Sequence, residues 1–334
     1  MKVPLSRVGL LLLLFVGAYG PLCDRTAIAQ PSQERESTVV KKTITYKMVG
    51  DVEIKADVYQ PNDLPNRPVV AWFHGGALMM GHRSGIPKQF LELGEKEGFV
   101  VVSFDYRLIP EAKLPDVIED LKDALNWIRT SGPKLFNADP RKLVVGGGSA
   151  GGYLALMSGF AIDPPPSAII SFWGFGDVDG KWTTTPNEAF LKSPLISDED
   201  AWALVGDKVL TNVDKDNGPG RWKFFIYLKQ QGSWAKVATG YDPETDRDKF
   251  TPFCPIRNIS AKYPPTLLVH GTADTDVPYQ KSVEMARELE RLGRPHRLIT
   301  LRDGRHGGWG GDPKLVVQAI EDSMDFIRTH LSQP

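Results

Sequence analysis

The stretch Leu143-Val144-Val145-Gly146-Gly147-Gly148-Ser149-Ala150-Gly151-Gly152-Tyr153 joins a short apolar run to a cluster of small residues around one serine. Continuous apolar and β-branched residues are typical of a central parallel strand, and glycines permit backbone angles that other residues avoid. We therefore predict a buried strand that turns sharply into a helix, with Ser149 at the tip of the turn. Gly147 to Gly151 fit the pattern G-x-S-x-G, which is typical of an exposed nucleophilic serine. A tight turn that merely carries a serine is the alternative.

Similar apolar runs recur on both sides of this strand and are separated by helix-like segments. The runs are 69–73, 99–104, 168–173, 265–270 and 297–301. Helical spacing of apolar residues marks 117–128, 283–292 and 315–331. Alternating strands and helices favour βαβ units with right-handed crossovers. The sequence thus predicts an α/β fold, a mostly parallel twisted sheet with helices on both faces. Segments 43–49 and 52–60 alternate polar and apolar residues and predict an antiparallel hairpin before it.

The interval from Phe175 to Pro255 interrupts this alternation. A structureless loop of such length is unusual in a compact domain, so we expect a helical cap insertion over about 175–255. Ser197 precedes three acidic residues, as at a helix start, and the segment 221–231 ends before Gly232, as at a helix end. The interval is rich in tryptophan and phenylalanine, which either fill the cap interior or line a pocket.

The N-terminus has the layout of a secretory signal peptide. Lys2 and Arg7 precede an apolar block, 8–20, and the small-residue triplet Ala27-Ile28-Ala29 follows it. The alternative, a membrane anchor, needs about 20 apolar residues, and this block is shorter. We predict a signal peptide over 1–29, with cleavage before Gln30.

The predicted signal peptide implies a protein exported to the periplasm or the cell exterior, without stable membrane insertion after cleavage. Residues 30–42 are polar and charged and predict a flexible lead-in, followed by one domain over 43–334. Forty basic residues balance 41 acidic ones. This balance provides no basic surface for nucleic acid or a membrane, so we expect no nucleic-acid partner and a small, weakly charged substrate.

A serine hydroxyl becomes a nucleophile when a histidine removes its proton, and a carboxylate must hold that histidine. Such groups meet in loops that follow parallel strands. Of the six histidines, only His306 combines a position after a strand with a glycine-rich surround. Asp274 and Asp276 both follow the preceding strand, and spacing alone favours neither as the acid.

A charge that develops on a carbonyl oxygen needs preorganised donors, usually backbone amides. His74-Gly75-Gly76-Ala77 follows the run 69–73 and leaves its backbone open to approach. Together with the amide of Ala150, at the start of the helix after Ser149, this loop can supply an oxyanion hole. A flexible turn is the alternative.

Together these motifs resemble an α/β-hydrolase of the esterase/lipase type, close to the hormone-sensitive-lipase-like and bacterial carboxylesterase branches and to BD-FAE-like enzymes. The matching segments are His74-Gly75-Gly76, Asp105-Tyr106-Arg107-Leu108, Gly147 to Gly152, His270 to Asp274 with Val277-Pro278, and His306-Gly307. The chain departs from the family pattern at Ala77, where a third glycine is usual, and at Gly148, where an aspartate is usual.

The resemblance implies roles for individual residues. It implies that Ser149, Asp274 and His306 form a catalytic triad. It also implies that the amides of Gly76, Ala77 and Ala150 form the oxyanion hole, with His74 and Gly75 as supporting residues. No cofactor or metal ion is expected. The resemblance further implies that the segment 105–108 supports the oxyanion loop.

These observations predict an exported serine carboxylesterase that acts through an acyl-enzyme on a small-molecule or carbohydrate ester. Acetylated or feruloylated carbohydrate is the substrate class that analogy with exported esterases suggests. Two alternatives remain open at this point. The first is an exported serine peptidase of the prolyl-oligopeptidase type, and the second is a non-catalytic binding protein on the same scaffold.

Overall fold

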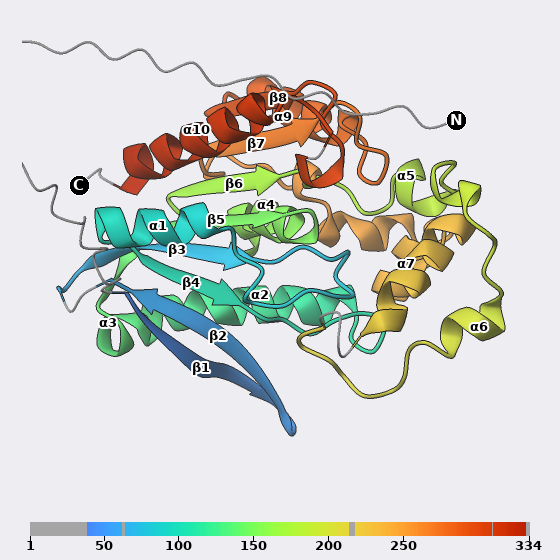
Figure 1. Cartoon of the computed structure of the whole chain (residues 1–334), viewed down its shortest axis with the longest axis horizontal. Helices are drawn as coiled ribbons and strands as arrows, with labels where there is room; N and C mark the ends of the chain where they lie inside the picture. The colour runs from blue at the N-terminus through green and yellow to red at the C-terminus, as the bar shows by residue number, and fades with distance from the viewer. Residues whose placement is uncertain (1–38, 62–63, 214–217, 309, 332–334) are drawn as a thin grey trace, which may run out of the picture. The chain divides into compact units, whose positions relative to one another are not determined.

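The strands of the computed structural model form one eight-stranded sheet in the order β1-β2-β4-β3-β5-β6-β7-β8 (Figure 1). β1 and β4 both pair with β2 in antiparallel fashion, and the remaining pairs are parallel. The strands are β1 (Val40–Val49), β2 (Val52–Gln60), β3 (Arg67–Phe73), β4 (Val100–Phe104), β5 (Ala138–Gly148), β6 (Ala168–Phe172), β7 (Thr266–Gly271) and β8 (His296–Leu301). The predicted hairpin and the predominantly parallel sheet are therefore confirmed.

The structure describes residues 39–61, 64–213, 218–308 and 310–331. The predicted signal peptide, 1–29, lies outside them, as does most of the predicted lead-in. Residues 40–42, which we assigned to the lead-in, are instead the start of β1. They pair with β2, and Lys41 adds an ion pair of 2.7 Å with Asp57, so the domain begins before residue 43.

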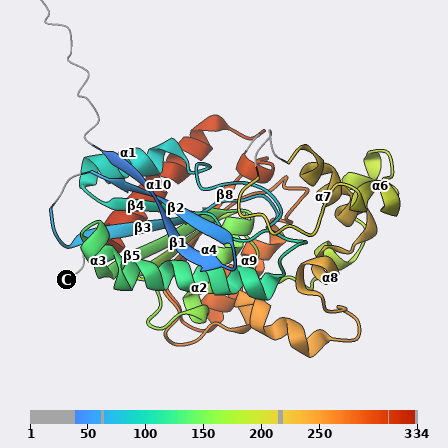
Figure 2. The ribbon, with the colours of Figure 1, turned by 90° about the horizontal axis from the view of Figure 1, so that it is seen from below.

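Helices cover both faces of the sheet (Figure 2). α1 (Lys88–Glu97) and α10 (Pro313–Leu331) pack on one face through Phe90 and Ile327. The other face carries α2 (Leu114–Thr130), α3 (Gly132–Leu135), α4 (Ala150–Ala161) and α9 (Gln280–Arg291). Two separate apolar clusters therefore sandwich the parallel strands, which explains why β4 and β6 are buried along their whole length.

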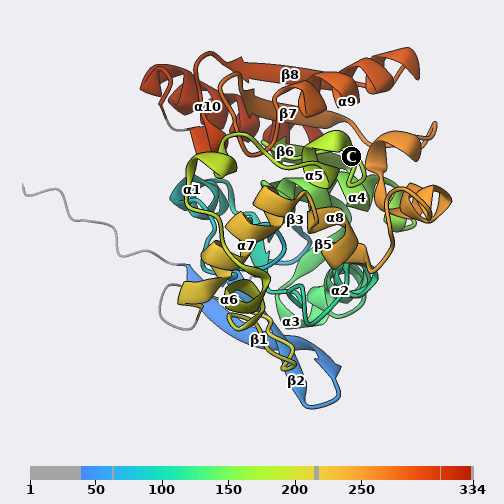
Figure 3. The ribbon, with the colours of Figure 1, turned by 90° about the vertical axis from the view of Figure 1, so that its right-hand side faces the viewer.

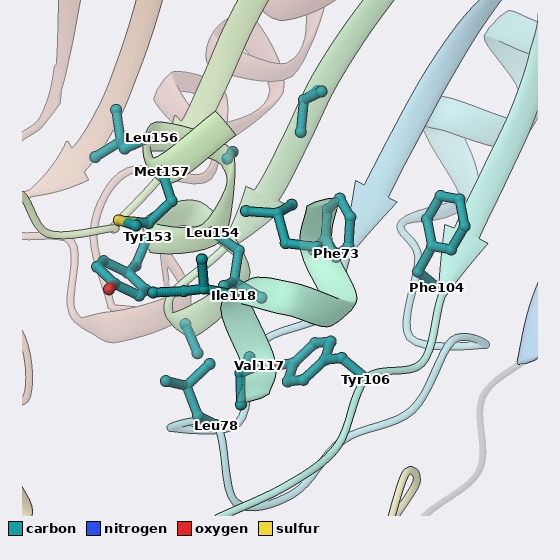
Figure 4. Close-up of a cluster of buried hydrophobic side chains, with 14 of the residues drawn as sticks. Phe73, Leu78, Phe104, Tyr106, Val117, Ile118, Tyr153, Leu154, Leu156 and Met157 are labelled. Atoms are coloured by element: carbon teal, nitrogen blue, oxygen red, sulfur yellow. The ribbon is translucent and has the colours of Figure 1, made fainter. Parts of the chain in front are cut away.

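The cluster on the α2 and α4 face lies directly beneath the carboxyl ends of the strands (Figure 4). Phe73 and Phe104 close β3 and β4, and their rings stack with centroids 5.2 Å apart. Val117 of α2 and Leu154 of α4 belong to the same buried cluster. Burying such side chains contributes roughly 1.5–3 kcal/mol each, so this packing fixes the position of α4 and of the turn that precedes it.

The interval between β6 and β7 forms the predicted helical cap. It comprises α5 (Lys181–Thr184), η1 (Phe190–Lys192), α6 (Asp198–Trp202), α7 (Pro219–Gln231), α8 (Trp234–Thr239), η2 (Arg247–Phe253) and η3 (Pro255–Arg257). Both predicted helix signals are confirmed, since Ser197 Oγ accepts a 3.1 Å bond from the Asp200 amide and α7 ends at Gly232. The cap helices lie beyond the carboxyl ends of the parallel strands (Figures 1 and 3). Among the described residues, no helix has the length and apolar character to cross a membrane.

Candidate active site

Ser149 occupies a strained turn between β5 and α4. Its φ is 56° and its ψ is −119°, a combination that residues other than glycine rarely adopt. The Ser149 amide donates a 2.8 Å hydrogen bond to the Phe172 carbonyl of β6, which holds the turn against the neighbouring strand. The sharp strand-to-helix turn expected from G-x-S-x-G is therefore present.

Gly151 makes this turn possible through its lack of a side chain. A Cβ atom at Gly151 would lie 1.9 Å from the carbonyl oxygen of Phe73. No side chain fits at that distance, so α4 approaches the end of β3 closely only because residue 151 is glycine.

The structure brings Ser149, His306 and Asp274 into one hydrogen-bonded chain. Asp274 Oδ2 lies 2.7 Å from Nδ1 of His306, and Nε2 of His306 lies 2.9 Å from Ser149 Oγ. A carboxylate only accepts hydrogen bonds, so Nδ1 carries the proton and Nε2 is free to accept from the serine hydroxyl. His306 starts the short helix η4 (His306–Gly308) after β8, and Asp274 follows β7. The geometry selects Asp274, not Asp276, as the partner of Nδ1.

Asp274 is held by four donors. Its Oδ1 accepts from the amides of Asp276 (2.9 Å) and Val277 (3.0 Å), and its Oδ2 accepts from His270 Nε2 (3.0 Å) as well as from His306. Burial alone would raise the pKa of Asp274, but the bonds from His270 and His306 outweigh it and lower the pKa to about 2. Asp274 is therefore ionised across the physiological range.

His270 is a residue whose role sequence reasoning missed. It is fully buried at the end of β7, and its Nε2 faces two acceptors, Asp274 Oδ2 and the Val277 carbonyl (3.0 Å). Nε2 therefore carries a proton, while Nδ1 lies 2.7 Å from Ser282 Oγ. The imidazole is fixed from both sides. The only sequence signal was its place in the segment His270 to Asp274.

The pKa of His306 lies above its ordinary value. Burial opposes the charged form, but the hydrogen bond to Asp274 and the negative charges of Asp276 and Asp274 outweigh burial and raise the pKa. Asp276 Oδ2 lies 3.8 Å from Nε2 of His306. The imidazole can therefore both take up and release a proton near neutral pH, as a base requires.

The loop His74 to Ala77 lies beside Ser149. A Cβ atom at Gly75 would be 3.3 Å from Ser149 Cβ. Gly76 and Ala77 have positive φ values of 113° and 55°, and within the described residues neither amide donates to a backbone carbonyl. The Ala150 amide, in the first turn of α4, has no acceptor inside its own helix. The three amides predicted for the oxyanion hole thus remain available around Ser149.

His74 supports this loop from below and is neutral. Burial lowers its pKa to about 4, although the hydrogen bond to the Gly75 carbonyl opposes the shift. Nδ1 of His74 lies 2.7 Å from that carbonyl oxygen and donates to it. Trp234 of the cap adds a further contact, because its Nε1 donates to the Ala77 carbonyl at 3.3 Å.

The segment 105–108 contacts the loop through Tyr106, whose hydroxyl donates a 2.8 Å hydrogen bond to the His74 carbonyl, and ion pairs hold the segment itself. Asp105 binds both the amide (2.7 Å) and the guanidinium (2.6 Å) of Arg83. Arg107 binds the fully buried carboxylate of Asp120 through Nε (2.9 Å) and Nη2 (2.9 Å), which ties the segment to α2.

A small cavity opens beside Ser149 beneath the cap. Its volume is about 20 Å³, and its lining includes Phe175, Trp182, Phe225, Trp234, Lys229 and Asp276. Some of the cap aromatics therefore line a pocket, while others, such as Phe224, are buried in the cap interior. The described residues contain no cluster of three or more histidine, cysteine, aspartate or glutamate side chains able to hold a metal ion.

Comparison with known proteins places this site in context. Among curated relatives, the non-reducing polyketide synthase adrD of Penicillium rubens is 26% identical over 87% of this chain, and trt4 of Aspergillus terreus is 27% identical over 85%. The chain spans about 14% of the length of either protein.

Solved structures match the fold over most of the chain. A Staphylococcus aureus protein of unknown function has a TM-score of 0.68 at 20% identity, covering 87% of this chain and 99% of that one. Native Thermogutta terrifontis esterase 2 has a TM-score of 0.58 at 22% identity, covering 86% of this chain and 92% of that one. The expected α/β-hydrolase fold is thus confirmed.

The BD-FAE family model matches residues 56–289, which is more than half of the chain. That match includes the turn at Ser149 and the loop of Asp274. The chain therefore belongs to the BD-FAE family of the α/β-hydrolase fold.

Proposed function

We propose that this chain is a serine carboxylesterase that hydrolyses esters of short acyl groups. The observation that carries the proposal is the continuous chain from Asp274 through His306 to the Ser149 hydroxyl, with distances of 2.7 and 2.9 Å. An acid, a base and an alcohol in this arrangement are the parts that acyl transfer requires. The family membership and the esterase-like fold support the same reaction class.

In the proposed mechanism, Ser149 Oγ attacks the ester carbonyl carbon while Nε2 of His306 takes the hydroxyl proton. Asp274 stabilises the imidazolium, and the amides of Gly76, Ala77 and Ala150 bind the oxyanion. Each such donor contributes about 10²- to 10³-fold in rate. His306 then protonates the leaving alkoxide as the ester C–O bond breaks. Water, deprotonated by His306, attacks the acyl-enzyme and releases the acid and free Ser149.

The size of the cavity beside Ser149 supports a short acyl group. At about 20 Å³, it has room for about one water-sized group, such as the methyl group of an acetyl ester. Among the carbohydrate esters considered above, this favours acetylated over feruloylated substrates. One solved structure of Thermogutta terrifontis esterase 2 has propionate bound, which is also a short carboxylate.

A substrate panel with the Ser149→Ala variant tests the proposal. We expect p-nitrophenyl acetate to be hydrolysed faster than the butyrate, decanoate and methyl ferulate esters, and Ser149→Ala to lose activity by at least about 10³-fold. Paraoxon, which phosphorylates Thermogutta terrifontis esterase 2, should add one phosphoryl adduct at Ser149. Turnover of peptidyl amides without ester hydrolysis would favour the peptidase, and absence of labelling and turnover would favour the binding protein.

We further propose export, on the basis of the charged and apolar pattern of residues 1–29. Expression of the full chain followed by cell fractionation and N-terminal sequencing tests it. We expect a processed protein outside the cytoplasm that begins at Gln30, and an unprocessed cytoplasmic chain would contradict the proposal.

A further inference from the structure

Lys229, on cap helix α7, is a buried cation at the edge of the candidate active site. Its side chain is 3% exposed, and its Nζ lies 4.9 Å from the ring centroid of Trp182 and 5.7 Å from that of Phe225. Aromatic rings attract a cation, but a buried ammonium also needs hydrogen-bond acceptors to replace the water it has lost.

Within the described part of the chain, the two oxygen atoms that Nζ of Lys229 contacts both belong to Asp276. Nζ donates a 3.0 Å hydrogen bond to the Asp276 carbonyl and lies 3.2 Å from Oδ1 of the carboxylate. The other carboxylate oxygen, Oδ2, is 3.8 Å from Nε2 of His306. Asp276 therefore stands between a cation of the cap and the nitrogen that accepts the Ser149 proton.

An unpaired carboxylate at this place would interfere with the proposed base. It would favour the protonated imidazole and offer Nε2–H an acceptor that competes with Ser149 and with the leaving alkoxide. Pairing with Lys229 compensates the charge of Asp276 and holds its carboxylate by Oδ1. The charged groups that act on His306 are Asp274 and Asp276 of the loop 272–279, which we call the acid loop, and Lys229 of the cap. His270 lies on the far side of Asp274 and donates to its Oδ2.

The cap has a second attachment to the same loop. Asn187 Nδ2 donates a 3.2 Å hydrogen bond to the Thr275 carbonyl, one residue before Asp276. Two cap side chains, Asn187 and Lys229, thus bind consecutive carbonyls of the loop that also carries Asp274. The position of the cap therefore affects the positions of the groups around His306 through these two hydrogen bonds.

We propose that Lys229 and Asp276 are a positioning pair that keeps Nε2 of His306 directed at Ser149. His306 can then accept the Ser149 proton efficiently only when the cap is docked on the loop that carries Asp276. The proposal rests on the serine mechanism proposed above. It assigns Asp276 a function distinct from that of Asp274, and it assigns the cap a part in the reaction beyond shaping the pocket.

The acid limb of the kcat/KM profile for p-nitrophenyl acetate tests the pair, because that limb reports the protonation of the free base. We expect Lys229→Met to move the midpoint up by about one pH unit, which is tenfold in activity on the acid side, because Asp276 is then unpaired. Asp276→Asn should move the midpoint down, and the double variant should follow Asp276→Asn. Lys236→Met is the matched control. It removes a cap lysine that is 61% exposed and bound to Asp242 at 2.9 Å, and its midpoint should equal that of the wild type.

Coincident midpoints for the wild type and Lys229→Met would overturn the proposal, as would a double variant that follows Lys229→Met. If Lys229→Met does not fold, Asp276→Asn decides alone, because it keeps the carbonyl that Lys229 binds, and an unmoved midpoint refutes the pair. Failure of the serine mechanism itself is recognised separately, by an active Ser149→Ala variant or by absence of the paraoxon adduct.

Discussion

Tyr106 stacks on His74 and fixes its backbone at the same time. The two rings lie 4.3 Å apart with their planes inclined by 15°, and the Tyr106 hydroxyl donates a 2.8 Å hydrogen bond to the His74 carbonyl. Both side chains are buried. The loop that carries the Gly76 and Ala77 amides is thus anchored at its first residue by a side chain from the end of β4.

Removing the Tyr106 hydroxyl should therefore affect catalysis more than stability. We expect Tyr106→Phe to lower the free energy of unfolding by about 1 kcal/mol and kcat by about tenfold, because the His74 carbonyl loses its donor and the oxyanion loop shifts. Tyr263→Phe is the control, since the Tyr263 hydroxyl is equally buried and donates to the Leu156 carbonyl, away from the site. It should show a similar loss of stability with kcat unchanged. Equal effects on kcat would contradict the role assigned to Tyr106.

Activity should fall on the acid side with a midpoint above pH 6.5. The reaction needs neutral His306, and the net effect of its carboxylate neighbours raises the pKa of this group above the ordinary 6.5. Activity is therefore lost as pH falls through that raised pKa, and Asp274, with a pKa of about 2, adds no transition nearby. The measurement is kcat/KM between about pH 5 and about pH 9. A midpoint below 6.5 would show that burial dominates.

Loss of the hydrogen bond from His270 to Asp274 should strengthen the interaction of the Asp274 carboxylate with protonated His306. We expect His270→Phe to lower kcat by about tenfold and to move the acid limb to higher pH, because one donor fewer stabilises the carboxylate. Ser282→Ala removes only the outer bond to His270 and serves as the matched control. If His270→Phe reduces stability without moving the limb, His270 is a packing residue only.

Substitution of Arg107 should lower the free energy of unfolding far more than the loss of an exposed ion pair does. Arg107→Met leaves the buried Asp120 with Lys47 (2.7 Å) as its remaining ion-pair partner, and we expect a loss of about 3–5 kcal/mol in urea unfolding. Lys88→Met breaks a pair with Glu92 at 2.7 Å in which both side chains are exposed, and it should cost less than about 1 kcal/mol. Similar losses for the two variants would contradict the prediction.

Gly151→Ala should prevent the turn at Ser149 from forming. The added Cβ atom meets the Phe73 carbonyl at 1.9 Å, so we expect a loss of more than about 3 kcal/mol or an insoluble protein. Gly206→Ala, where nothing lies within 4 Å of the added atom, is the control and should fold normally. Melting temperature and soluble yield provide the comparison.

The parallel strands and the turn at Ser149 were predictable because both depend on local sequence. β4 and β6 are apolar except for one serine each, and glycines lie on both sides of Ser149. β5 was predicted too short: it begins at Ala138, but its first half contains Asp139 and Arg141, and charged residues of this kind do not signal a strand.

Roles that depend on contacts between distant segments were not predictable from spacing. Asp274 and Asp276 differ by two positions in one loop, and the family resemblance, not the spacing, indicated the carboxylate that lies 2.7 Å from Nδ1 of His306. Lys229 lies on a helix with lysines at positions 223 and 229, and a lysine there normally marks a solvated face. Its burial arises from the docking of α7 on the acid loop, which no spacing along the chain reveals.

The cap is one continuous insertion between β6 and β7, and Ser149, Asp274 and His306 all lie outside it. The cap aromatics that line the cavity beside Ser149 are therefore encoded in one continuous segment, apart from the three residues of the triad, and recombination at two junctions would exchange that segment as a unit. Chimaeras with caps from other members of this fold offer a direct route to new substrate ranges. The design constraint is specific: the grafted cap must deliver a cation to the carboxylate of Asp276.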